Sequence, residues 1–419
     1  MKPLLLVAAL LFCLFLALPL VQMATGRLPD VPLAGVETPT AGPAVGARAW
    51  WNGTMQTDFD AWLAQRVGLR GALVRTANQI RYVLFRELPK RSGTQVLLGR
   101  EGMLYEKVYV DAYNANGQRP ARELANVSAS TKRLQDRLAQ DGIAFLLVIA
   151  PSKAEIYPEF LPPEADVAGR PARRSNYENF IEHLRRDGVH VVDGHALFQE
   201  WKREPGAPRL FANGGTHWNE YGAARIVAEI TRRLRDLTGK DLPTAEIVGA
   251  VTNRTIVGED NDLGELANLW SPRLLAGPQV HPVTEVRPGA HVPDLLFVGD
   301  SFVFTLTNFM DRHGLYRKRN TYYYYNREYF WPAAPNAPLD KRQLDLLAEL
   351  QGRDVTRGES DLKGHIKGAE ESDKGSGSAA YVPPDPKDDV QLSYALDLLR
   401  GVKTDAAFPP NPDQAVLNQ

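Results

Sequence analysis

Residues 295–302 read LLFVGDSF and decide the fold predicted for this chain. The four apolar residues are typical of a strand buried on both faces. Gly299 permits a tight turn after that strand, and the backbone around Asp300 offers N–H groups that a developing oxyanion would need. Ser301 then begins a stretch with helical spacing. A serine at such a turn is either an exposed nucleophile or a residue that caps the helix, and this stretch alone fits both.

A candidate base lies upstream in residues 214–219, which read GGTHWN and precede a strongly amphipathic stretch. A serine nucleophile needs an adjacent group that accepts its proton, and histidine is the side chain most often used. A single histidine in a loop is more often packed and hydrogen-bonded without a chemical role. The joint occurrence of His217 and Ser301 nevertheless favours a serine–histidine pair.

Strands and helices alternate through the middle of the chain. Continuous apolar runs predict strands at 143–150, 189–193, 295–298 and 321–325, and helical spacing predicts helices at 123–140, 175–186, 220–237 and 302–312. This alternation indicates a three-layer α/β domain, a parallel sheet with helices on both faces. Residues 247–275 follow neither pattern and are expected to pack beside the core as an insertion.

The ends of the chain differ from this middle part. The apolar run at 4–21 has the length of a membrane span, so we predict a single-pass signal-anchor in residues 1–26; a cleaved signal peptide is the alternative. Residues 27–48 are rich in proline, glycine and alanine and are expected to be a linker. The catalytic domain is predicted at 49–350, and the polar segment 351–419 is predicted to be mostly disordered.

The composition excludes several classes of function. The formal net charge is −1, with no basic patch, which argues against nucleic acid as a partner. The single cysteine, Cys13, lies in the apolar run, so the predicted exported part has no thiol for disulfides or catalysis. The eight histidines are scattered without metal-ligand spacing, and no glycine-rich phosphate loop is present. We therefore predict neither a metal nor a cofactor.

Several motifs together resemble one known family. They are LLGREGMLY at 97–105, APSKAEIYP at 150–158, Thr-His-Trp at 216–218 and Gly-Asp-Ser at 299–301. The histidine motif precedes the serine motif, the reverse of ordinary SGNH hydrolases. In this order the motifs are similar to those of the SGNH hydrolase-like polysaccharide O-acetylation proteins, the AlgJ/AlgX type of alginate O-acetyltransferase. The resemblance extends from about residue 50 to residue 331.

The resemblance implies a function and a location. Ser301 would accept an acetyl group and pass it to hydroxyls of an alginate-like exopolysaccharide, with His217 moving the protons. The acetyl donor would be a multi-spanning membrane acyltransferase, and other polysaccharide-assembly proteins would be partners. The chain would be anchored in the bacterial inner membrane with its catalytic domain in the periplasm. A carbohydrate acetylesterase with the same chemistry is the alternative.

The chain departs from the family pattern at one position. The family has Asp-Thr-His-Trp, and the aspartate position is Gly215 here. Asp193 and Glu220 are candidates for an orienting carboxylate in its place. A backbone carbonyl that orients His217 would leave a serine–histidine dyad. A catalytically weak polysaccharide-binding subunit is the third possibility, because loss of the orienting aspartate costs about 10⁴-fold in rate in a serine triad.

Some residues are weaker candidates for contact with the polysaccharide. An aromatic face can stack on a sugar, and amide or cationic side chains can bind sugar hydroxyls or acidic groups. Each such residue also has an ordinary structural role available, because a lysine at a strand end is usually solvated and alternate strand residues face opposite ways. The candidates are Lys153, Trp218, Tyr323, Asn326 and Arg327.

Overall fold

The computed structural model divides the chain into two units, Met1–Ser360 and Asp361–Gln419. It describes residues 2–27, 31–35, 42–43, 45–90, 95–114, 117–163, 165, 174–323 and 327–331, all of them in the first unit. The disordered tail predicted at 351–419 and the candidate Asn326 lie outside the described residues. The domain boundaries predicted from the sequence therefore stay predictions.

Among the described residues, four helices precede the first strand: α1 (Lys2–Thr25), α2 (Ala47–Trp51), α3 (Thr54–Arg66) and α4 (Arg70–Phe85). Among the residues that the structure describes, no helix combines the length and the apolar character needed to cross a membrane. The signal-anchor in residues 1–26 and the linker at 27–48 remain predictions.

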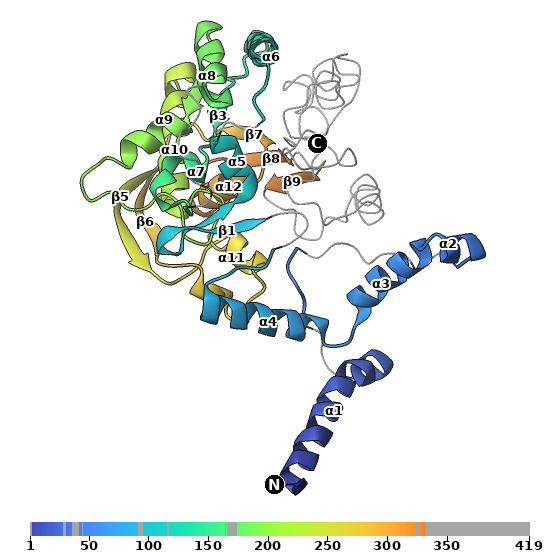
Figure 1. Ribbon diagram of the computed structural model, residues 1–419. Coiled ribbons are helices and arrows are strands. Elements are labelled where there is room, and N and C mark those ends of the chain that lie inside the picture. Colours follow the sequence, from blue (N-terminus) through green and yellow to red (C-terminus); the bar gives the residue numbers. More distant parts are fainter. Residues whose placement is uncertain are drawn as a thin grey trace, which may run out of the picture. The chain divides into compact units, whose positions relative to one another are not determined.

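One parallel strand pair is covered on both faces. β3 (Leu147–Ile149) pairs in parallel with β4 (Val191–Asp193). Successive side chains point to opposite faces of a strand. Val148 and Val192 pack in the main core, and Leu147 and Val191 pack in a second cluster with Leu184. The main core includes residues of α10 (Glu220–Thr238) on one face of the pair, and the second cluster includes residues of α8 (Asn176–Arg186) on the other face. α6 (Ala121–Gln140) packs against α8 (Figure 1).

A second group of strands carries the serine motif. β7 (Asp294–Gly299) pairs in parallel with β8 (Lys318–Tyr323), and β9 (Arg327–Trp331) adds to β8 in the antiparallel sense (Figure 1). The connection from β7 to β8 is α12 (Phe302–His313), which packs against α10. Leu295 and Phe297 contact the same core as Val148. Leu296 and Val298 on the opposite face are exposed, so the prediction that this strand is buried on both faces is wrong. The predicted parallel pairing is thus present, although the described strands form four separate sheets and not one.

The remaining described elements are two hairpins and several short helices. The hairpins are β1 (Val96–Leu98) with β2 (Leu104–Glu106), and β5 (Thr244–Asn253) with β6 (Gln279–Arg287). The short helices are α5 (Lys107–Tyr113), α7 (Lys153–Ile156), α9 (Gly194–Trp201), α11 (Asp262–Leu266) and the 3₁₀ turns η1 (Arg100–Gly102), η2 (Pro158–Phe160) and η3 (Pro272–Leu274).

The insertion expected at 247–275 is in part the first strand of the β5–β6 hairpin. The second strand of this hairpin, β6, was not predicted from the sequence. Pro282 interrupts its apolar alternation, and a proline argues against a strand interior. Between the two strands the chain forms α11, and that helix begins at Asp262. The segment that the sequence left unassigned therefore reaches the candidate site.

Candidate active site

Ser301 stands between β7 and α12. It occupies the N-cap position of α12, but its side chain makes no capping hydrogen bond. Asp300 takes that role, because its Oδ1 accepts a hydrogen bond from the N–H of Phe302 (3.0 Å). The Oγ of Ser301 instead lies 2.7 Å from Nε2 of His217. Of the two sequence interpretations, this geometry favours the nucleophile over the cap.

The loop that carries His217 is anchored in the core. Phe211 and Trp218 form an isolated antiparallel bridge, and Asn219 caps α10 by accepting from the N–H of Gly222 (2.9 Å). Trp218 is only 1% exposed, and its ring packs edge-on against Phe302 at 5.1 Å. The prediction that Trp218 contacts the polysaccharide is wrong, because its side chain is enclosed in the core.

A carboxylate lies close to the other nitrogen of the imidazole. Oδ2 of Asp262 lies 2.8 Å from Nδ1 of His217. Its Oδ1 accepts from the N–H groups of Thr216 (2.8 Å) and Leu263 (2.7 Å), so both carboxylate oxygens are held. A proton on Nδ1 directed at Asp262 leaves the Nε2 lone pair for the hydroxyl of Ser301. Ser301, His217 and Asp262 thus lie in the order of the residues of a serine triad: a hydrogen bond joins Ser301 to Nε2 of His217, and the carboxylate of Asp262 lies within ion-pair distance of Nδ1.

Neither carboxylate proposed from the sequence occupies this position. Asp193 caps α9 through the N–H of Ala196 and accepts a hydrogen bond from the hydroxyl of Tyr177. Glu220 is buried and lies 2.8 Å from Nδ1 of His281. The prediction is corrected to Asp262. Sequence reasoning missed it because Asp262 lies in the unassigned insertion, and no local pattern links that insertion to the histidine motif.

Gly215 explains how Asp262 reaches the imidazole. A Cβ atom built on Gly215 would lie 2.9 Å from the carbonyl oxygen of Glu259 and 3.1 Å from the carbonyl carbon of Asp260. Real Cβ atoms essentially never approach another atom as closely as 2.9 Å, and 3.1 Å is tighter than nine in ten real Cβ contacts. The backbone leading into α11 thus occupies space that an aspartate side chain at position 215 would need. The carboxylate beside the imidazole therefore comes from residue 262 and not from residue 215, and it lies at Nδ1 of His217.

Lys153 lies beneath the same loop and is 4% exposed. Its Nζ donates to the carbonyl oxygens of Ala212 (2.7 Å), Asn213 (2.9 Å) and Gly215 (2.7 Å). The prediction that Lys153 faces acidic sugar is therefore wrong. The side chain is used inside the protein, in contrast to the solvated lysine that usually follows a strand.

Three aromatic side chains from α12, β8 and β9 contact one another near the start of α12. Phe304 lies one helical turn after Ser301, so the two residues share a face of α12. Its ring meets Tyr323 (4.9 Å) and Tyr329 (5.3 Å) edge to face, and Tyr329 is 36% exposed. We call these three residues the aromatic cluster. The backbone of Arg327 belongs to β9, but its predicted sugar contact, like that of Asn326, stays a prediction.

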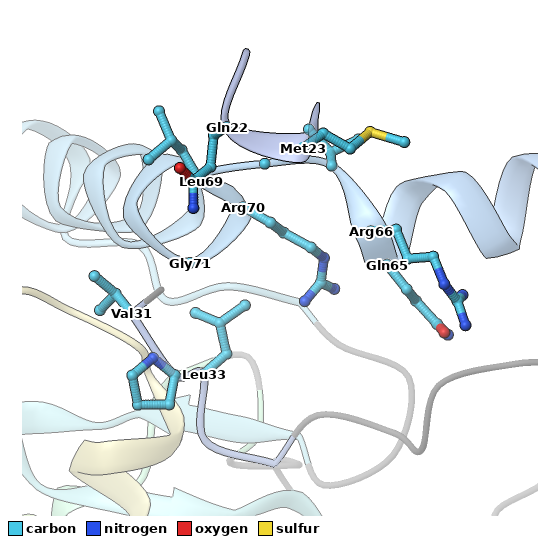
Figure 2. A pocket seen from close by; sticks show the side chains of 12 residues that line it. Gln22, Met23, Val31, Leu33, Gln65, Arg66, Leu69, Arg70 and Gly71 are labelled. Atoms are coloured by element: carbon cyan, nitrogen blue, oxygen red, sulfur yellow. The ribbon is translucent and has the colours of Figure 1, made fainter. Parts of the chain in front are cut away.

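The described residues also contain a pocket away from this site. A pocket of about 350 Å³ is lined by the end of α1, by residues 31–33 and by the turn between α3 and α4 (Figure 2). Leu69, Arg70 and Gly71 line it from the start of α4, and it includes none of the triad residues. Within the ranges that the structure describes, no group of three or more histidine, cysteine, aspartate or glutamate side chains could hold a metal ion.

The family follows from the sequence match together with this site. The model of the "SGNH hydrolase-like domain, acetyltransferase AlgX" family matches residues 96–312, just over half of the chain. The chain therefore belongs to this family of SGNH hydrolase-like acetyltransferase domains. Ser301, His217 and Asp262 all lie inside the matched residues.

Individual relatives cover only part of the chain. The "Probable alginate O-acetylase AlgJ" of Pseudomonas aeruginosa is 25% identical over 210 residues, 50% of this chain and 48% of that protein. A "Carboxy-terminal-processing protease" of Bartonella bacilliformis is 70% identical over 66 residues, 16% of this chain and 15% of that protein. The chain thus spans about half or less of the length of these relatives. The O-acetyltransferase domain of Pseudomonas putida AlgJ, a solved structure, has a TM-score of 0.38 and 24% identity, and the match covers 56% of this chain and 80% of that one.

Proposed function

We propose that this chain is an anchored, periplasm-facing O-acetyltransferase that forms an acetyl-serine at Ser301 and transfers the acetyl group to hydroxyls of an alginate-like exopolysaccharide. The observation that carries the proposal is the arrangement of three side chains within an AlgX-family domain: Nε2 of His217 is hydrogen-bonded to Ser301, and its Nδ1 lies 2.8 Å from the carboxylate of Asp262. A relative named as a probable alginate O-acetylase supports the class of substrate.

In the first half-reaction Ser301 becomes acetylated. Its Oγ forms a bond to the acetyl carbonyl carbon while Nε2 of His217 takes the hydroxyl proton. The carbonyl oxygen becomes an oxyanion, for which we propose the backbone N–H groups at the turn of Gly299 and Asp300 as donors. The bond to the donor's oxygen then breaks, and His217 returns the proton to that leaving group. Asp262 stabilises the transient imidazolium and holds its tautomer.

In the second half-reaction the sugar replaces the donor. His217 takes the proton of a sugar hydroxyl while the hydroxyl oxygen forms a bond to the acetyl carbon. The bond to Oγ of Ser301 breaks, and the serine regains its proton from His217. Water in place of the sugar would release acetate, the reaction of an acetylesterase. The two activities therefore differ only in which hydroxyl reaches the acetyl-serine.

We propose that the aromatic cluster binds the acceptor sugar, because it is partly exposed and one of its members, Phe304, lies one helical turn from the nucleophile. Tyr323→Ala should raise the KM for an oligosaccharide acceptor about 3- to 10-fold, since aromatic contacts contribute roughly 0.5–1.5 kcal/mol. The rate of Ser301 acetylation by a small ester should change little. Tyr323→Phe keeps the ring and is the matched control. An unchanged acceptor KM in Tyr323→Ala would remove the cluster from the acceptor site.

The apolar N-terminal run supports the proposed location, and the family resemblance supports the proposed donor. We propose that residues 1–26 anchor the chain in the bacterial inner membrane, and that a multi-spanning membrane acyltransferase delivers the acetyl group. Other polysaccharide-assembly proteins would then act on the same polymer. Fractionation of expressing cells should recover the full chain with the inner membrane, and recovery in the soluble fraction would contradict the anchor.

The alternative of a catalytically weak binding subunit depended on the loss of a carboxylate at Gly215. Asp262 lies at the atom where that carboxylate is needed, which supports an enzyme. The decisive experiment incubates the full chain with p-nitrophenyl acetate and follows its intact mass. An acetyl adduct should form and should be absent in Ser301→Ala.

A mannuronate oligosaccharide added next should remove the adduct and become acetylated itself. Release of acetate without acetylated oligosaccharide would indicate an acetylesterase instead. A folded protein that never forms the adduct would overturn the acyl-serine mechanism. These outcomes separate the nucleophile from the choice of acceptor.

A further inference from the structure

The buried ammonium of Lys153 donates three hydrogen bonds inside the protein. α7 begins at Lys153, directly after the segment that follows β3. The three carbonyl oxygens of Ala212, Asn213 and Gly215 lie 2.7–2.9 Å from its Nζ. A protonated amine has three hydrogens and no acceptor, so every hydrogen has a partner. A neutral amine has only two hydrogens, and its lone pair would then face a carbonyl oxygen.

The electrostatic surroundings make this charge costly. Burial is the main cause that lowers the pKa of Lys153, to about 7, and the nearby Arg209 contributes in the same direction. The carboxyl groups of Asp262 and Asp260 act in the opposite direction, and burial raises the pKa of Asp260 itself to about 8. The ring of Tyr105 also faces the ammonium, with its centroid 5.5 Å from Nζ. A buried ammonium held mainly by carbonyl groups is expensive compared with an apolar side chain of the same size.

The three carbonyl groups belong to the loop that ends at His217. Gly215 is two residues before His217, and its carbonyl accepts from Lys153. The next residue, Thr216, donates its N–H to Asp262. Lys153 thus holds the loop through the carbonyl of Gly215, and Asp262 holds it through the N–H of Thr216, immediately before His217. Movement of this loop would change the distances from His217 to both Ser301 and Asp262.

We propose that Lys153 is a positioning residue: its ammonium holds the loop 212–215 so that His217 stays aligned between Ser301 and Asp262. Lys153 does not touch substrate and acts only through the backbone of this loop. The proposal rests on the proposed function, because acetylation of Ser301 is its readout. The role requires the charged form, since that form alone donates to all three carbonyl groups.

The first test compares Lys153→Met with the wild-type chain, both full length, using p-nitrophenyl acetate. Methionine has a similar length but no donor, so the acetylation rate constant of Ser301 should fall roughly tenfold, because small misplacements of a catalytic group are costly. The KM for the ester should stay within about twofold. Lys107→Met changes an exposed lysine on α5 and should leave the rate unchanged. An unchanged rate in Lys153→Met would overturn the proposal.

The pH profile separates positioning from a general loss of stability. In the wild type the acetylation rate should decline as the pH rises above about 7, because Lys153 loses its proton and with it one of the three hydrogen bonds. Lys153→Met has no proton to lose there and should lack this decline. A wild-type profile without the decline, or the same decline in both proteins, would contradict the proposal.

Chemical rescue gives a third readout. The only natural thiol is Cys13, so Lys153→Cys in a Cys13→Ser background can be aminoethylated selectively while unfolded and then refolded. The restored ammonium should recover most of the tenfold loss, whereas alkylation to an uncharged amide should not. Failure of the wild type to form any adduct would contradict the proposed function. A normal wild-type adduct without rescue would contradict the role of Lys153 alone.

Discussion

Asp262→Asn should lower the rate of Ser301 acetylation by about 10⁴-fold while the protein stays folded. The amide oxygen can still accept from the N–H groups of Thr216 and Leu263, so the local backbone keeps its partners. The amide nitrogen then faces Nδ1 of His217 and donates to it. That hydrogen bond selects the tautomer with its proton on Nε2, and this tautomer cannot accept the proton of Ser301.

The measurement is the rate of appearance of the acetyl adduct by intact mass, with thermal unfolding as a check on folding. Asp193→Asn is the matched control, because Asp193 accepts hydrogen bonds at the start of α9 and from Tyr177 and Arg185, away from His217. This substitution should change the rate by no more than about threefold. A large loss in Asp193→Asn combined with a small loss in Asp262→Asn would reverse the assignment of the orienting carboxylate.

The second prediction concerns the residue that departs from the family pattern. Gly215→Ala should lower the acetylation rate by about 10²-fold, a typical cost of displacing a catalytic group by about 1 Å. The added Cβ would meet the backbone of Glu259 and Asp260, and backbone cannot swing aside as the end of a side chain can. The segment that carries Asp262 must therefore move away from His217.

Gly249→Ala is the control for this substitution, because a Cβ there meets nothing closer than 3.9 Å. The double variant Gly215→Ala with Asp262→Asn gives the sharper test. Two changes that act through one contact are not additive, so the double variant should lose no more than Asp262→Asn alone. Fully additive losses would show that Gly215 acts through something other than the position of Asp262.

Gly215 and Asp262 together give a physical reason for the departure from the family pattern. The lack of a side chain at Gly215 and the close approach of the 259–262 backbone require each other. Through that approach the chain brings Asp262 to Nδ1 of His217. We infer that the orienting carboxylate has changed its place in the sequence while keeping its place beside the imidazole. The prediction for Gly215→Ala tests this inference directly.

The sequence by itself determined the elements that carry the serine and the histidine. A continuous apolar run predicted β7, helical spacing predicted α10 and α12, and the pairing of two motifs predicted that Ser301 meets His217. These features are local, because burial on one face or two leaves a period in the residues themselves. The short length of β3 and the strand β6 were not visible in this way.

Only the tertiary structure decided the remaining parts of the site. Asp262, Lys153 and Trp218 acquire their roles from neighbours far away in the sequence. Asp262 meets His217 because Gly215 leaves space for its backbone, and Lys153 is buried because the loop 212–215 folds over it. Trp218 lies beside the base but points into the core. Such contacts depend on packing in three dimensions, and a residue's type and immediate neighbours do not specify which distant backbone it will meet.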